Sequence, residues 1–169
     1  MTHCQTLTVD FEEEIVNTRK LLALVPLDDA HRNYQPHPKS MALARLATHV
    51  AELPSWSNLA LETEVFVLPL DFKPQIAAST DELLAIFDKA AQEGRTALAN
   101  ATDEDMEKTW TFKYGDKFSL TAKRPNTVRS FLNHLVHHRA QLGVYLRLLD
   151  IAIPGMYGPS ADERDALNL

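Results

Sequence analysis

Three of the seven histidines stand at positions from which their imidazole rings could meet. His134 and His138 are four residues apart in a segment with a helical pattern, a spacing that brings two rings to one helix face about 6 Å apart. His49 lies in another predicted helix, on the same stripe as Leu46 and Leu53. Three imidazole nitrogens can bind one divalent cation and leave positions open for water or a substrate. In the alternative interpretation, each ring is partly buried and bonds only to a carbonyl or carboxylate.

The position of each histidine around its helix separates the candidates from their neighbours. At about 100° per residue, His134 and His138 fall at the margin of the apolar face, whereas His137 points to solvent. The residue after His134 is Leu135, at the position where a His-Glu-x-x-His metalloprotease carries its general base. The pattern therefore indicates zinc, nickel or a similar borderline cation without protease chemistry.

Other side chains on these two helices could support the site or the core. Gln141 and Tyr145 continue the histidine stripe and could orient a ligand, although a tyrosine there is also consistent with packing. Arg139 falls within the apolar face, so we expect it to pair with a buried carboxylate. We expect Glu52 to be solvated and Trp56 to belong to the core.

Positive charge is concentrated around a predicted hairpin. The segment 108–129 holds six lysine and arginine residues against a single acid, Asp116. This surplus is typical of a solvated rim, and it is also consistent with an entrance that attracts a small anionic ligand. Arg124 and Arg129 are the better candidates for binding a small anionic cofactor, because a helix start also offers free N–H groups. No residue pattern identifies a catalytic acid or base.

The elements that must position these residues are mostly helical. Apolar periodicity predicts four long helices, over 6–25, from about 39 to 61 with a kink at Pro54, over 80–100 and over 124–150. We therefore expect an all-α fold, an up-and-down-like four-helix bundle with a small β-hairpin before the last helix.

The hairpin is predicted by a change of period between 106 and 121, where large apolar residues alternate with polar ones. A loop over 115–117 pairs Tyr114 with Phe118 and keeps the large apolar side chains on one face. The segments 27–38 and 66–78 are expected to be loops, and the tail after residue 150 to be extended.

Composition limits the class of protein. The 169 residues are 45% hydrophobic and 24% charged, as is typical of one soluble domain spanning 1–169. A net charge of −6 argues against a nucleic-acid partner, and a lone cysteine, Cys4, excludes a disulfide framework. No apolar run approaches the roughly 18 residues of a membrane span, and no signal peptide is visible. A cytoplasmic protein without a membrane partner is expected.

The segments that carry the histidines resemble the DinB/YfiT-like family of four-helix bundles. The matching pieces are the stretches 37–49, 133–142, 145–149 and 154–162. By this resemblance, the three metal-binding histidines of the family fall on His49, His134 and His138. Alanine stands at position 140, where many relatives carry glycine, and this difference puts no ligand in doubt.

The resemblance also implies a kind of activity. Some relatives are metal-dependent enzymes that handle low-molecular-weight thiols, which implies a transferase that conjugates such a thiol to an electrophilic small molecule, in a stress response or in detoxification. A hydrolase-like enzyme is a related alternative, and a non-catalytic metal-binding or dimeric stress-response protein is the competing hypothesis. Relatives often pair, so the resemblance also implies a homodimer.

Overall fold

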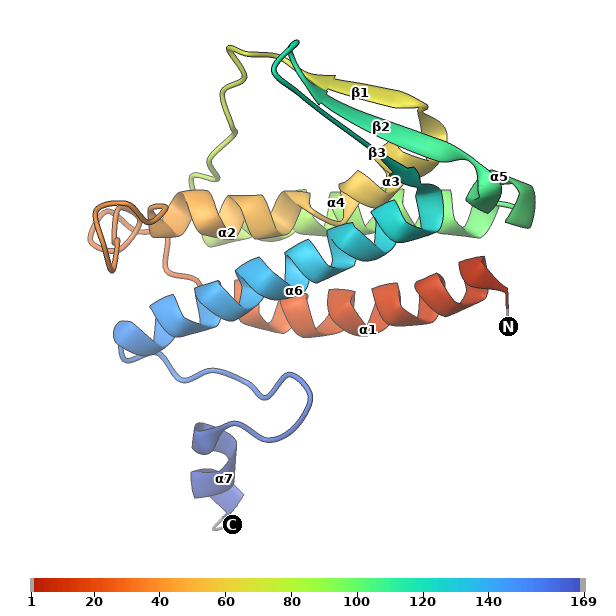
Figure 1. Ribbon diagram of the computed structural model, residues 1–169. Helices are drawn as coiled ribbons and strands as arrows, with labels where there is room; N and C mark the ends of the chain where they lie inside the picture. Colours follow the sequence, from red (N-terminus) through yellow and green to blue (C-terminus); the bar gives the residue numbers. More distant parts are fainter. Residues whose placement is uncertain (1, 168–169) are drawn as a thin grey trace.

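The computed structural model describes residues 2–167, in which four long helical segments carry a small sheet on one side (Figure 1). The elements in chain order are α1 (His3–Leu22), α2 (Leu43–Glu52), α3 (Ser55–Glu62), β1 (Val65–Leu68), α4 (Thr80–Asn100), α5 (Asp103–Glu107), β2 (Thr109–Tyr114), β3 (Phe118–Lys123), α6 (Arg124–Leu148) and α7 (Ala161–Leu167). The helical bundle expected from the sequence is therefore present, together with more β-structure than a hairpin.

The order of the helices around the bundle differs from the expected up-and-down arrangement. Helix α1 packs against α4 and α6, and α2 packs against the same two helices, so α1 and α2 are diagonal partners. Figure 1 shows α1 and α6 running in one direction and α2 and α4 in the other. The long connections 23–42 and 63–79 make this order feasible, because each can cross the bundle or return along it.

The second helical segment is interrupted at Pro54, as predicted. Helix α2 ends at Glu52 and α3 begins at Ser55, because a proline inside a helix lacks an N–H and clashes with the preceding turn. Helix α4 comes very close to this interruption at Gly94. A Cβ atom on Gly94 would lie 2.7 Å from the carbonyl oxygen of Pro54 and 2.6 Å from the ring of Phe11. Glycine is therefore required for the contact.

The sheet contains the predicted hairpin and one strand that was not predicted. Strands β2 and β3 are antiparallel and pair Tyr114 with Phe118 across a loop that includes Gly115, whose φ is +50°. Strand β1 lies in the segment expected to be a loop and pairs in parallel with β2, Val65 opposite Thr111. That expectation was wrong because the pairing joins segments about 45 residues apart and leaves little local signal in a four-residue strand.

Two short helices were not predicted: α5 precedes the hairpin, and α7 lies in the tail that was expected to be extended. The side chain of Thr102 caps α5 by accepting a hydrogen bond from the backbone N–H of Asp105. The side chain of Ser160 accepts a hydrogen bond from the N–H of Glu163, whose carboxylate accepts one in return from the N–H of Ser160, so α7 begins in a capping box. Helix α2 begins at Leu43 and not near residue 39, because the N–H of Leu43 donates to the carbonyl of Tyr34 in the preceding loop.

The core lies between the four long segments. Its largest fully buried side chains come from all of them and include Phe11, Leu46, Phe87 and Leu135. Within residues 2–167, no helix combines the length and apolar character that crossing a membrane requires.

Candidate metal centre

His49, His134 and His138 meet where α2 faces α6. One ring nitrogen from each lies within 4.8 Å of the others, and the Nε2 atoms of His49 and His134 are 3.2 Å apart. His49 is 7% exposed, whereas His134 and His138 are half-buried. His137 is exposed, as predicted from its position on α6. We refer to the three converging residues as the histidine triad.

Burial keeps the histidine triad uncharged at neutral pH. It lowers the pKa of His49 to about 3, and the charge that His138 acquires when protonated, the positive charge of Arg45 and the charge of a protonated His134 add to this effect. Burial is also the main reason why the pKa values of His134 and His138 are lowered. Neutral imidazoles keep the lone pairs that a cation requires.

One of the three rings is fixed by a neighbour on its own helix. The Nδ1 atom of His138 lies 2.8 Å from Oε1 of Gln141. Because this amide oxygen can only accept, Nδ1 carries the proton and Nε2 keeps its lone pair. Gln141 thus has the orienting role that the sequence suggested. Tyr145 instead donates its hydroxyl hydrogen to the carbonyl of Met41, 3.0 Å away, and so supports packing.

The donor set fits a divalent cation. Two nitrogens bound to one zinc ion at about 2.0–2.1 Å in a tetrahedral site would lie about 3.3 Å apart, close to the 3.2 Å between His49 and His134. The buried Nδ1 of His49 has no hydrogen-bond partner among the described residues.

Trp56 borders the histidine triad and is not simply a core residue. Its ring stands edge-on to His49 and His134, with centroid distances of 5.6 and 5.4 Å. The same ring contacts Phe131 at 5.3 Å, and Phe131 contacts Trp110 of β2 at 5.7 Å. An aromatic wall of Trp56, Phe131 and Trp110 therefore runs from the triad to the sheet.

Two charged residues beside the histidine triad were not among the predicted site residues. Arg45 and Glu52 lie one turn before and one turn after His49 on α2, and their side chains approach to 3.5 Å. Glu52 was expected to be solvated, but its side chain is only 24% exposed, and burial raises its pKa. The i−4 and i+3 spacing from His49 was the available signal.

The predicted anion-binding arginines do not join the histidine triad. Arg124 is buried, donates a hydrogen bond to the carbonyl of Thr63 and pairs with Asp105 at 3.5 Å. It precedes His134 by ten residues, or about 15 Å along the helix axis. Arg129 is exposed and, at about 100° per residue, faces away from the triad. These positions give no support to a role for either residue in binding a ligand at the triad.

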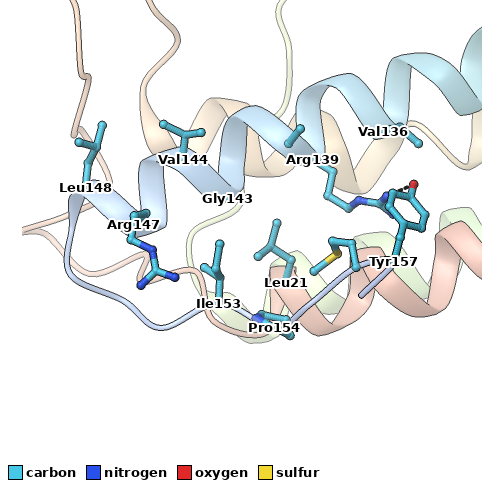
Figure 2. A pocket seen from close by; sticks show the side chains of 12 residues that line it. Leu21, Val136, Arg139, Gly143, Val144, Arg147, Leu148, Ile153, Pro154 and Tyr157 are labelled. Atoms are coloured by element: carbon cyan, nitrogen blue, oxygen red, sulfur yellow. Dashed lines mark hydrogen bonds between the residues drawn. The ribbon is translucent and has the colours of Figure 1, made fainter. Parts of the chain in front are cut away.

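Arg139 has the buried partner expected from the sequence. Its guanidinium pairs with Glu14, whose side chain is 14% exposed, and also bonds to Thr18 and Tyr157. Figure 2 shows Arg139 and Tyr157 in a groove of about 470 Å³ between α6 and the tail that follows it. The residues of α6 in this groove face away from the histidines, so this groove is not the triad site.

One family model matches nearly the whole chain. The DinB family model matches residues 4–166. With a fold of helices and a histidine triad already described, this match shows that the chain belongs to the DinB family. No curated protein matches it.

Solved structures of DinB-like proteins share the fold. A protein from Bacillus subtilis is 18% identical with a TM-score of 0.66, over 89% of this chain and 96% of its own. A protein from Bacillus cereus is 20% identical with a TM-score of 0.67, over 90% of this chain and 97% of its own. YfiT from Bacillus subtilis, described as a probable metal-dependent hydrolase with an unusual four-helix bundle topology, is 15% identical with a TM-score of 0.62, over 88% of this chain and 89% of its own.

Proposed function

We propose that this DinB-family protein binds one divalent cation, zinc or nickel, through His49, His134 and His138 and uses it in catalysis. The observation that carries the proposal is the convergence of three uncharged imidazoles from two facing helices at a partly open position. Three protein ligands are typical of catalytic zinc sites, whereas structural sites are closed by four. The description of the similar YfiT structure as a probable metal-dependent hydrolase supports this assignment.

The reaction that we propose is transfer of a low-molecular-weight thiol to an electrophilic carbon. When bound, the cation lowers the pKa of a coordinating thiol and so supplies a thiolate at neutral pH. A sulfur–carbon bond forms while the leaving group departs with its bonding electrons, and the thiol proton passes to solvent. In this reaction Gln141 keeps His138 oriented, and Trp56 excludes water from one side of the triad.

Hydrolysis is the second candidate, and Glu52 is the observation that favours it. This half-buried carboxylate lies one turn after His49 on α2, and burial raises its pKa. A carboxylate of raised pKa beside a cation site can accept a proton from an attacking water molecule. A non-catalytic protein, in which the cation only stabilises the bundle or a homodimer, is the remaining alternative from another class.

Turnover by metal-loaded and metal-depleted protein separates these functions. The transferase predicts a thioether product from an aryl halide and one of four thiols (bacillithiol, mycothiol, glutathione or cysteine), detected by mass spectrometry, only when metal is present. Hydrolysis predicts release of nitrophenol from nitrophenyl esters without any thiol. Metal-dependent melting without either product would contradict both enzymatic functions and favour the non-catalytic protein.

A further inference from the structure

The two ends of the histidine triad differ in chemistry. Along α2 and α3 the order is Arg45, His49 and Trp56, so a positively charged side chain lies on one side of His49 and an aromatic ring on the other. The Trp56 ring contacts His134 of α6, whereas Arg45 stands one helical turn before His49 on α2. A ligand at the triad therefore meets a cationic end and an apolar end.

The ion pair of Arg45 and Glu52 spans the helical turn that carries His49. The two residues are seven positions apart, or about 10 Å along the helix axis, and Nη1 of Arg45 comes within 3.5 Å of the Glu52 carboxylate. Because Arg45 stands one turn before His49 and Glu52 one turn after it, this pair lies along the side of α2 next to that histidine.

Arg45 has unused capacity to donate hydrogen bonds. Its Nη1 atom is buried but makes no hydrogen bond with any described residue, because the approach of Glu52 at 3.5 Å has the distance of an ion pair without hydrogen-bond geometry. The side chain as a whole is 21% exposed. A ligand that brings an acceptor within hydrogen-bond distance of this Nη1 atom would satisfy it.

We propose that Arg45 binds a carboxylate on the small molecule that occupies the histidine triad, while the apolar part of that molecule lies against Trp56. The planar guanidinium matches a carboxylate in shape and charge. This inference deepens the proposed function, on which it rests, by naming the substrate class as a carboxylate-bearing thiol. It also assigns anion recognition to a residue inside the bundle and not to Arg124 or Arg129.

The test compares two thiols that differ only in charge. Protein loaded with Co²⁺ in place of zinc would be titrated with 3-mercaptopropionate and with its methyl ester, and cobalt-thiolate absorption would report binding. For each protein, the affinity for the free acid is divided by the affinity for the ester. We expect this ratio to be at least about tenfold larger in the wild-type protein than in Arg45→Gln, as expected for one charged hydrogen bond. The two thiols differ in their own pKa values, but this difference is the same for every variant, so comparing the ratio between variants removes its contribution. Arg45→Lys keeps the charge and should retain part of the preference.

Three results would overturn the inference in distinguishable ways. An unchanged preference in Arg45→Gln, with cobalt still bound at the wild-type stoichiometry, would overturn the role of Arg45 alone. Loss of the preference in Arg129→Gln but not in Arg45→Gln would assign recognition to the basic segment near the hairpin. Absence of cobalt-thiolate absorption with both thiols would overturn the proposed transferase and this inference together.

Discussion

At the scale of single residues, His49 is the most deeply buried member of the triad. Its sequence position places it on an apolar stripe of α2, and the structure leaves it 7% exposed with an unpartnered Nδ1. Helical spacing was enough to select His49, His134 and His138 and to separate them from His137. Spacing could not select Trp56, because its contact with the triad depends on the interruption at Pro54 and on which helix faces α2.

Acid should destabilise the metal-free protein through His49. Its folded-state pKa is about 3 against an ordinary value of 6.5, so between these values the unfolded chain binds more protons. The stabilisation is complete above pH 6.5 and is lost as pH falls toward 3, by up to about 1.4 kcal/mol per pH unit for one histidine. Urea unfolding between pH 7 and 4 measures this slope. His49→Leu should flatten it, and an equal slope in the two proteins would contradict the prediction.

Gln141 should tune the cation affinity without being a ligand. Gln141→Ala removes the acceptor that orients the His138 ring, and loss of such a support costs roughly 10–100-fold in metal affinity. Competition with a chelator would measure the change. Gln92→Ala is a matched control, since Gln92 lies on exposed α4 surface and bonds only to Thr96. Equal affinities in the two variants would contradict the role of Gln141.

At the scale of elements, local signals explain which parts could be predicted. The long helices follow from periodicity, since one face of each is buried, and the hairpin register follows from the alternation of large apolar residues with polar ones. The capping box of Ser160 and Glu163 was a local signal for α7 that the interpretation of an extended tail overlooked. Strand β1 had no comparable signal because its partner is β2, far along the chain. The diagonal placement of α1 and α2 likewise depends on long connections that carry no periodicity.

The contact between α4 and the Pro54 interruption can be tested with two glycines. Gly94→Ala places a Cβ atom 2.7 Å from the carbonyl oxygen of Pro54 and should lower the free energy of unfolding by about 1–3 kcal/mol. Gly143→Ala, in α6, meets nothing nearer than Ile153 at 3.9 Å and should gain up to about 1 kcal/mol in helix propensity. Thermal unfolding compares them, and a stable Gly94→Ala protein would contradict the close approach.

At the scale of the whole molecule, Arg139 connects segments that are distant in the chain. Its guanidinium joins Glu14 and Thr18 of α1 to Tyr157 of the tail, and its side chain is 2% exposed. Helix α6 therefore contributes two of its faces to separate parts of the molecule. One side supplies two histidines to the triad, and the other holds the tail against α1 (Figure 2).

Removing Arg139 should weaken the whole fold while sparing the histidines. Arg139→Ala leaves the Glu14 carboxylate without its partner, and breaking a buried pair costs about 3–5 kcal/mol. Arg19→Ala removes an exposed pair with Asp88 and should cost less than about 1 kcal/mol. Chemical denaturation of both variants provides the comparison. Similar losses would indicate that the buried pair contributes no more than an exposed one.

The most direct test of the central claim is metal stoichiometry in matched histidine variants. His138→Ala and His137→Ala remove adjacent imidazoles from α6, one inside the triad and one exposed to solvent. After reconstitution with zinc and gel filtration, elemental analysis should give about one zinc per chain for the wild type and for His137→Ala, and much less for His138→Ala. Retention of zinc by His138→Ala together with its loss from His137→Ala would contradict the triad as the metal site.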